Sequence, residues 1–515
     1  MAGSSMADTG PPPLRWVSLA AICTAAGMVW LAFGDLGVAL PVIADEFTTS
    51  LSTLQWANNA FSLVTGALVI AAGRFGDIFG RRRMLVLGLV LLAAFSVLAA
   101  LAPGAGWLVV GRGLMGVGAA LILPASLALI PPEFSGRAEI TAFGIWQAVA
   151  WGGLSIGPAI SGGVTEALGW RWLFWINLPL AAVTLVAVRL TTRESRDPGA
   201  SRRVDWLGLA CIGAAVFALL YALTEGPAAG WTDPVVVGLF AATVVFAVAW
   251  FHVERRARDP LVDLRLFRRR TYDGALTANL TMNLAFSGMS FLLVLWLENT
   301  RGYSPVEAGL LMLPATFGVF AFIPLGGRMD ARRGGRPPAV GGLVVAAAGL
   351  FLLGFLGTET RVWFPVALFI IGLGLGLVST PVANTAVGDV PRDLAGTAAG
   401  VFKMSSMLGG ALGVAVLTAF ARGLTENAAA GAVARSGLTS AEIAQAREAL
   451  VNSSSFKDAL ASLPPDLRAA VVRAVTDAFD TGVARTMVAT AILTLAATVL
   501  AFFLWPRGVE KPTPE

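Results

Sequence analysis

The residue whose type and position most clearly indicate chemistry is an aspartate in a long apolar stretch. Asp35 lies within residues 16–41, a stretch long enough to cross a bilayer. A charged side chain inside a membrane costs at least about 2.5–3.5 kcal/mol on insertion scales, so an acid at this depth indicates a functional site. We therefore expect Asp35 to take up and release protons. The alternative is a neutral or paired acid that only holds helices together.

An arginine occupies a second apolar stretch that is rich in small residues. Arg112 stands in the segment GRGLMGVGAA, residues 111–120. An unpaired guanidinium buried there would be very costly, so we expect an acidic or carbonyl partner. Alternatively, the side chain extends to the membrane interface, because it lies near one end of the stretch. A contact between Arg112 and Asp35 would make the two residues a proton-coupling pair.

Glycines, an aspartate and arginines combine in the segment GRFGDIFGRRR, residues 73–83. Glycines permit a tight turn and close backbone approach, and an aspartate near a helix end can accept charge-assisted hydrogen bonds from a neighbouring helix. The pattern predicts a helix-to-helix connection with a polar latch formed by Gly73, Asp77, Gly80, Arg81 and Arg82. The alternative is an ordinary basic turn.

A further apolar stretch contains GLSIGPAISGG, residues 153–163. Proline removes a backbone hydrogen bond and kinks a helix, while small residues let a second helix cross closely. The residues that define this pattern are Gly153, Gly157, Pro158, Gly162 and Gly163.

The elements that must position these residues are membrane helices. The chain has 515 residues, of which 56% are hydrophobic and 13% charged, too few polar residues for a soluble protein of this size. Only helices or closed barrels satisfy all backbone groups in lipid, and the short alternating segments of a barrel are absent. The sequence predicts an all-α polytopic protein with fourteen spans, at 16–41, 54–73, 84–102, 107–130, 140–166, 171–190, 205–224, 233–251, 274–297, 305–327, 337–357, 362–388, 395–421 and 484–505.

Basic residues gather on one set of connections between the predicted spans. The short connections on the opposite side carry only Arg171, Arg301 and Arg361. The positive-inside rule therefore predicts that both termini are cytoplasmic. It also explains the net charge of +5 without nucleic-acid binding. We expect no cleavable signal, because the first apolar run is too long for one.

Segment 73–83 resembles the signature loop of the major facilitator superfamily, G-x-x-x-D-x-x-G-R-[KR]. In that family the loop latches the outward-open state on the cytoplasmic side. Segment 111–120 resembles the family motif R-x-x-x-G-x-G-x-A, whose arginine is implicated in proton transfer. Segment 153–163 is similar to the antiporter motif G-x-x-x-G-P-x-x-G-G, with Ser161 in place of one glycine.

The segment GWRWLFWINLP, residues 169–179, is similar to the signature of the fourteen-span drug:proton antiporters. The resemblance implies two six-helix bundles with spans 205–224 and 233–251 as the extra pair. It divides the chain into a cytoplasmic tail 1–15, a bundle 16–190, a linker with the inserted pair 191–273, a bundle 274–505 and a tail 506–515.

The second half of the chain repeats the first loop more weakly, as GGRMDARRGGR at 326–336. Residues 423–482 form a predicted extracellular insert with two short helices, one capped at Thr439 to Glu442 and one with Asp466 as N-cap. Lys403 stands where a neutral residue is usual. We expect its ammonium to reach the cytoplasmic interface, the alternative being that it faces a carboxylate.

The predicted function is proton-coupled export of amphipathic or cationic small molecules such as drugs or antibiotics, by alternating access in a bacterial cell membrane. The alternative is export of a lipid or of an endogenous secondary metabolite. We expect no cofactor beyond the proton gradient, a monomer, and no enzyme activity, because no nucleophile–base pair, metal cluster or phosphate-binding loop is found. Polar and aromatic candidates for a substrate cavity are Asn58, Asn59, Phe61, Trp146, Gln147, Asn279, Asn283 and Asn384.

Overall fold

The computed structural model describes residues 12–37, 39–197, 205–256, 265–355, 363–435 and 464–506. All regular elements in these ranges are helices, which confirms the all-α prediction. In chain order they are α1 (Pro12–Gly34), α2 (Leu40–Phe47), α3 (Leu51–Phe79), α4 (Arg81–Ala100), α5 (Ala105–Ala128), α6 (Ile130–Glu133), α7 (Arg137–Leu168), α8 (Trp172–Trp175), α9 (Asn177–Thr191), α10 (Trp206–Ala229), α11 (Pro234–Arg256), η1 (Leu266–Arg268), α12 (Arg270–Asn299), α13 (Pro305–Leu311), α14 (Leu313–Arg333), α15 (Arg336–Phe355), α16 (Trp363–Ala383), η2 (Asn384–Gly388), η3 (Arg392–Leu394), α17 (Ala395–Arg435) and α20 (Pro465–Leu504).

Twelve helices in the described ranges are long and apolar enough to cross a membrane. The protein is therefore a polytopic membrane protein, as the composition predicts. The helices α7 and α14 cover two further predicted spans, 140–166 and 305–327, but are not among the twelve. The count of fourteen spans stays a prediction.

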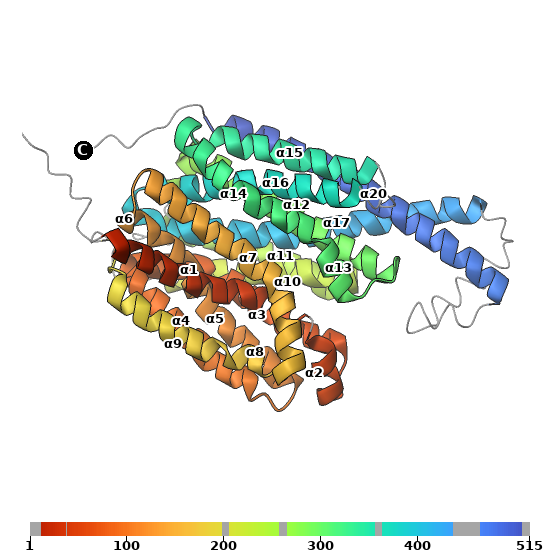
Figure 1. The fold of residues 1–515 in the computed structure, drawn as a ribbon, viewed down its shortest axis with the longest axis horizontal. Coiled ribbons are helices and arrows are strands. Elements are labelled where there is room, and N and C mark those ends of the chain that lie inside the picture. Colours follow the sequence, from red (N-terminus) through yellow and green to blue (C-terminus); the bar gives the residue numbers. More distant parts are fainter. Residues whose placement is uncertain are drawn as a thin grey trace, which may run out of the picture.

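The long helices run side by side along the long axis of the molecule (Figure 1). One group, here the N-terminal group, packs α1, α3, α4, α5, α7 and α9 against one another. A second, the C-terminal group, packs α12, α14, α15, α16, α17 and α20. The two groups meet mainly where α3 contacts α17 and where α7 contacts α14 and α16. The exact domain boundaries stay a prediction.

The pair α10 and α11 covers the stretches predicted as inserted spans. Helix α10 packs against both α3 and α17, so it contacts both groups. A methyl group at Gly66 of α3 would overlap Leu220 of α10, which shows how closely these two helices approach. Helix α11 packs mainly on α10 and leaves about half of its apolar side chains exposed.

Small residues set the close helix contacts inside each group. In the N-terminal group, a Cβ atom at Gly118 would lie 2.7 Å from the Gly88 carbonyl oxygen. In the C-terminal group, a Cβ atom at Gly318 would lie 2.8 Å from the backbone nitrogen of Leu373. Apolar side chains give no hydrophobic driving force between helices in lipid, so packing through such small residues holds the groups together.

The first predicted span is wrong at its end. Helix α1 ends at Gly34, and Asp35 lies in a short break before α2 instead of inside a helix. Glycine is a poor helix former and Pro41 is well placed in the first turn of α2, which accounts for a stop and a new start. Asp35 therefore lies at the end of the helix, where backbone groups are not paired within the helix.

The insert predicted at 423–482 differs from its prediction. Helix α17 continues to Arg435, and α20 is one helix from Pro465 to Leu504, so the helix predicted to begin at Asp466 is not short but continues into the last predicted span. Pro464, not Asp466, is the N-cap of α20, and Pro465 occupies the first helical position, where proline is well tolerated. The predicted capping box from Thr439 to Glu442 lies outside the described residues.

Candidate functional site

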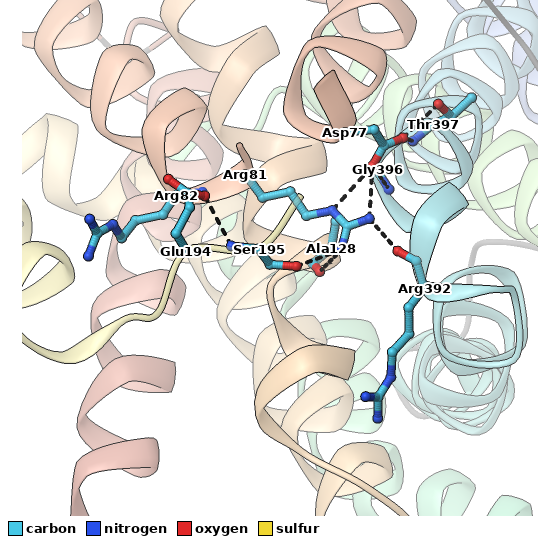
Figure 2. Close-up of polar contacts among 9 residues, drawn as sticks. All are labelled: Asp77, Arg81, Arg82, Ala128, Glu194, Ser195, Arg392, Gly396 and Thr397. Carbon is cyan, nitrogen blue, oxygen red and sulfur yellow. Dashed lines mark hydrogen bonds and ion pairs between the residues drawn. The ribbon is translucent and has the colours of Figure 1, made fainter. Parts of the chain in front are cut away.

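A buried carboxylate joins the two groups of helices at the end where α3 meets α4. Asp77 is fully buried and accepts hydrogen bonds from the backbone N–H groups of Gly396 (2.9 Å) and Thr397 (2.7 Å) and from the Thr397 hydroxyl (2.8 Å). Both residues belong to the first turn of α17, and a helix N-terminus attracts an anion through its free N–H groups and its dipole. Figure 2 shows this arrangement. We call this end of the molecule the Asp77 end.

Arg81 completes the contact from the start of α4. Its Nε and Nη2 atoms donate to Asp77 Oδ1 at 3.2 and 2.9 Å, and Nη2 also donates to the Arg392 carbonyl of the C-terminal group. Gly80, at φ +110°, allows the sharp turn that brings Arg81 back to Asp77. Arg82 faces the other way, and its backbone N–H donates to Glu194 Oε1 at 3.0 Å.

Gly73 lets the two helices come close enough for these bonds. A Cβ atom at Gly73 would overlap the carbonyl oxygen of Gly396, so no larger residue fits while the contact is closed. The structure thus brings together Gly73, Asp77 and Arg81 of the predicted latch around the start of α17. Sequence reasoning did not identify the partners Gly396 and Thr397 for this role.

The second buried carboxylate lies near the other end of the N-terminal group. Asp35 is 8% exposed, and its Oδ1 atom lies 3.5 Å from Nη1 of the fully buried Arg112. Arg112 Nη2 donates to the Ala32 carbonyl and to Asn58 Oδ1, both at 2.7 Å, and its guanidinium lies over the Phe61 ring. Arg112 is therefore anchored by a carbonyl and an amide, and does not extend to an interface.

The two aspartates differ in how fully they are hydrogen-bonded. Asp35 Oδ1 and Arg112 Nη1 are buried and have no hydrogen-bond partner within the described residues, because 3.5 Å exceeds good hydrogen-bond geometry. Asp77 accepts five hydrogen bonds. A carboxylate with open lone pairs beside a cation can gain or lose a proton with little rearrangement, whereas a saturated one is held in place.

The helix with the proposed antiporter motif, α7, packs on α1 through its glycines. A Cβ atom at Gly153 would lie 2.8 Å from Trp30 Cβ, and one at Gly157 would lie 3.3 Å from the backbone of Gly34. Gly34 directly precedes Asp35, so α7 packs against the end of the helix that carries the acid. A Cβ atom at Gly163, six residues further on, would contact nothing within 4 Å.

The prediction for Lys403 is wrong. Its side chain is 4% exposed and does not reach an interface; the ammonium lies 4.2 Å from the centroid of the Trp146 ring. The ring faces of Trp30 and Phe402 lie at 5.4 and 4.9 Å. Aromatic faces attract a cation electrostatically, which explains why the side chain turns inward instead of extending along the helix.

The predicted cavity residues fall into separate places. Asn58 and Phe61 contact Arg112, and Trp146 contacts Lys403, as described above. Gln147 Nε2 donates to the Ser379 carbonyl at 3.1 Å, a bond between α7 and α16 that joins the two groups. Asn59 is half-buried on α3.

The remaining three asparagines bond within the C-terminal group. Asn279 Nδ2 donates to the hydroxyls of Ser405 and Ser406, both at 2.8 Å, which ties α12 to α17. Asn283 donates to the Asn279 carbonyl at 2.8 Å. Asn384 lies on η2 and donates to Asp330 Oδ2 at 3.0 Å, far along the chain from the other candidates and near α6.

Sequence reasoning missed a group of acids near Asn384. Burial, and then the nearby Asp389, raise the pKa of Asp330 to about 7, against the lowering effect of the hydrogen bond from Asn384. Burial, and then Asp389, raise the pKa of Glu139 to about 8, against the lowering effect of Arg392. The repeated glycine–aspartate–arginine order pointed to Asp330, but no signal in the sequence placed Glu139 of α7 close to it.

Comparisons with known proteins agree with this architecture. The Major Facilitator Superfamily pattern matches residues 17–414. The puromycin resistance protein pur8 of Streptomyces alboniger is 36% identical over 82% of this chain and 84% of its own length. The probable actinorhodin transporter of Streptomyces coelicolor is 32% identical over 98% of this chain and 94% of its own.

A solved structure supports the fold alone. The human organic anion transporter MFSD10 (TETRAN) aligns with a TM-score of 0.61 at 15% identity, covering 96% of this chain and all of its own. Three findings lead to the same family. They are the two groups of long membrane helices, the glycine–aspartate–arginine latch between them, and the pattern match over most of the chain. The protein belongs to the major facilitator superfamily and is a transporter related to drug and antibiotic resistance proteins.

Proposed function

We propose that this protein exports amphipathic, drug-like small molecules in exchange for protons, by alternating access between its two groups of helices. The single observation that carries the proposal is the loosely paired Asp35–Arg112 couple. An acid with an unpartnered oxygen, buried beside a fixed cation, can bind a proton in one state and release it in another. Relatives named for puromycin resistance and actinorhodin transport support export of small organic molecules.

The latch supports the alternating part of the proposal. Asp77 and Arg81 bond across the two groups at one end, and we infer that this end faces the cytoplasm, with both termini on the same side. The described state is then closed toward the cytoplasm. Opening this end requires that Asp77 leave the start of α17. Protons and substrate would then exchange with the outside while the contact is formed, and with the cytoplasm while it is broken.

A proton-flux experiment tests the coupling. In respiring everted vesicles, a panel of aromatic antibiotics that includes puromycin would be added while the internal pH is followed with a dye. We expect the chain to release protons on substrate addition and Asp35→Asn to abolish that release. Glu166→Gln, which removes an exposed acid at the end of α7, is the matched control and should behave as the unaltered chain does. Unchanged proton-coupled export by Asp35→Asn would overturn the assignment.

A second candidate is export of a secondary metabolite that the host itself makes. It is favoured by the relative named as a probable actinorhodin transporter, which aligns over nearly the whole chain. Both candidates use the same coupling chemistry, so deletion of the gene separates them. Loss of secretion of a compound made by the host would support the second, whereas sensitivity to added antibiotics alone would support the first.

A further inference from the structure

Lys403 lies where the two groups of helices meet. It belongs to α17 of the C-terminal group, while two of the three rings around its ammonium, Trp30 and Trp146, belong to α1 and α7 of the N-terminal group. The third ring is its neighbour Phe402. At 4% exposure the cation is withdrawn from solvent and from the lipid headgroups.

No acid balances this cation within the described residues. The buried Arg112 has a carbonyl, an amide oxygen and Asp35 around it, but Lys403 forms no ion pair with a described carboxylate. Ring faces attract a positive charge, yet they do not accept its three N–H donors as oxygen atoms do. The ammonium therefore retains capacity for an acceptor with negative charge.

A second donor beside Lys403 is also unpartnered. The indole nitrogen of Trp30 is buried and has no hydrogen-bond partner within the part of the chain that the structure describes. The indole nitrogens of Trp146 and Trp151, in contrast, donate to Ser126 and Ser379 at 3.1 and 3.0 Å. A buried donor without an acceptor is rare in native proteins and calls for an explanation, such as a ligand that supplies the oxygen.

Aromatic side chains continue from this point toward the proton-coupling pair. Trp30 packs on Phe33 with ring centroids 5.4 Å apart, and Phe33 packs edge-on against Phe61 at 4.9 Å. Phe61 in turn lies under the guanidinium of Arg112. The surroundings of Lys403 thus combine two unpartnered donors with a row of rings, which suits a planar aromatic body that carries an acidic group.

We propose that Lys403 and Trp30 bind the carboxylate or phenolate group of an aromatic organic anion, whose ring system stacks along the aromatic residues of α1 and α3. The inference rests on the proposed export function and replaces cationic compounds, as the preferred substrates, with anionic ones. Trp146 and Phe402 hold the ammonium in place from the ring side, and the anion supplies the charge and the acceptor oxygens that the protein lacks there.

Binding of three probes with one ring system tests this inference directly. The purified chain in nanodiscs would be titrated calorimetrically with 2-naphthoate, its neutral methyl ester and 2-naphthylmethylammonium, against empty nanodiscs. We expect 2-naphthoate to bind most tightly. Lys403→Met should weaken it by at least about tenfold, because a charge-assisted hydrogen bond is lost. Binding of the ester should change less than about twofold, and Lys403→Arg should retain most of the preference for the anion.

The indole donor has its own matched pair of variants. Trp30→Phe keeps an aromatic ring and removes the unpartnered N–H, so 2-naphthoate should bind about three- to tenfold more weakly. Trp151→Phe removes an N–H that already donates to Ser379 and should leave binding within about twofold of the unaltered chain. Equal affinity of the unaltered chain for all three probes would overturn the inference, as would unchanged 2-naphthoate binding by Lys403→Met.

The proposed function and this inference can fail separately. The titration uses no proton gradient, so tight 2-naphthoate binding together with proton-coupled export that survives Asp35→Asn would overturn the coupling alone. Proton-coupled antibiotic export by a chain that does not discriminate among the three probes would overturn the anion site alone.

Discussion

The two halves of the chain carry the same glycine–aspartate–arginine order, but their aspartates have different surroundings. Asp77 accepts five hydrogen bonds, three of them from the start of α17 in the other group. Asp330 is also buried, yet its carboxylate accepts one hydrogen bond within the described residues, from Asn384 of its own group. The repeated motif therefore places a buried aspartate in each half, and the residues that face it determine how many hydrogen bonds it accepts.

The opposing residues explain the difference. Asp77 faces backbone N–H groups and a hydroxyl at a helix start, all of which are donors. Around Asp330, α7 contacts α14 and brings Glu139 into the neighbourhood, and Asp389 adds a third carboxylate. Negative charges close together in a buried place disfavour ionisation. One contact is a latch held by donors, and the other is a group of acids that favours protonation.

The largest expected effect comes from removing the latch acid. Asp77→Ala leaves Arg81 buried without its carboxylate, and breaking a buried pair in this way costs about 3–5 kcal/mol. We expect the free energy of unfolding, measured by detergent titration, to fall by that amount. Asp45→Ala removes an exposed acid of α2 as a control and should change it by less than about 0.5 kcal/mol. Similar losses for both variants would contradict the latch.

The glycines of the two loops provide the next test. A Cβ atom at Gly73 would overlap the Gly396 carbonyl, whereas one at Gly327 would lie 3.5 Å from Ile140 of α7, an ordinary contact. We therefore expect Gly73→Ala to cost about 1–3 kcal/mol and to increase the distance between spin labels on α3 and α17. Gly327→Ala should leave both quantities nearly unchanged. Equal effects of the two substitutions would mean that the close helix approach is not specific to the loop that contains Gly73.

Several of these features could be predicted from the sequence because they are local. The spacing of Gly73, Asp77 and Arg81 within one turn-and-helix segment identified the latch, and apolar length identified the membrane helices. The sequence could not reveal what lies opposite, because Thr397 is 320 residues from Asp77 along the chain. Local spacing thus predicts an element and its polar residues, but not the partner that completes the contact.

Orientation about a helix axis was the main source of error. The position of Lys403 along α17 predicted an ammonium at the membrane interface. The ammonium instead lies over the ring faces of Trp30 and Trp146, which belong to two other helices. Asn384 was expected beside the other polar candidates, but η2 places it against Asp330 at the Asp77 end. One sequence indicates the polarity of a residue and its depth, and not the neighbour that its side chain faces.

The acid group around Asp330 predicts a pH dependence of the free energy of unfolding. The pKa values of Glu139 and Asp330, about 8 and about 7, lie above their ordinary values. The folded chain then binds more protons than the unfolded chain between about pH 4 and pH 8, so the free energy of unfolding falls as the pH rises through this window. Allowing for solvent at the half-buried Glu139, we expect a fall of several kcal/mol, most of it from Asp330.

Melting curves of the chain in nanodiscs at several pH values measure this slope. Glu139→Gln should flatten it, because the group that ionises at the highest pH is gone. Glu166 is an exposed acid at the other end of the same helix, so Glu166→Gln should retain the slope. A steeper slope in Glu139→Gln, or stability that rises with pH in the unaltered chain, would contradict the assignment of raised pKa values to this group.

The smallest expected effect is at Asp330 itself, the counterpart of Asp77. Asp330→Asn keeps an oxygen that can accept from Asn384 Nδ2, and it replaces an acid that burial and Asp389 keep largely neutral, so little is lost. We expect the free energy of unfolding to change by less than about 1 kcal/mol near pH 6, where the acid is mostly protonated already. Near pH 9 the variant should be the more stable form, because the unaltered chain must then bury an ionised carboxylate among other acids. A large loss at both pH values would show that Asp330 is held by donors as Asp77 is, and that the two halves do not differ in this way.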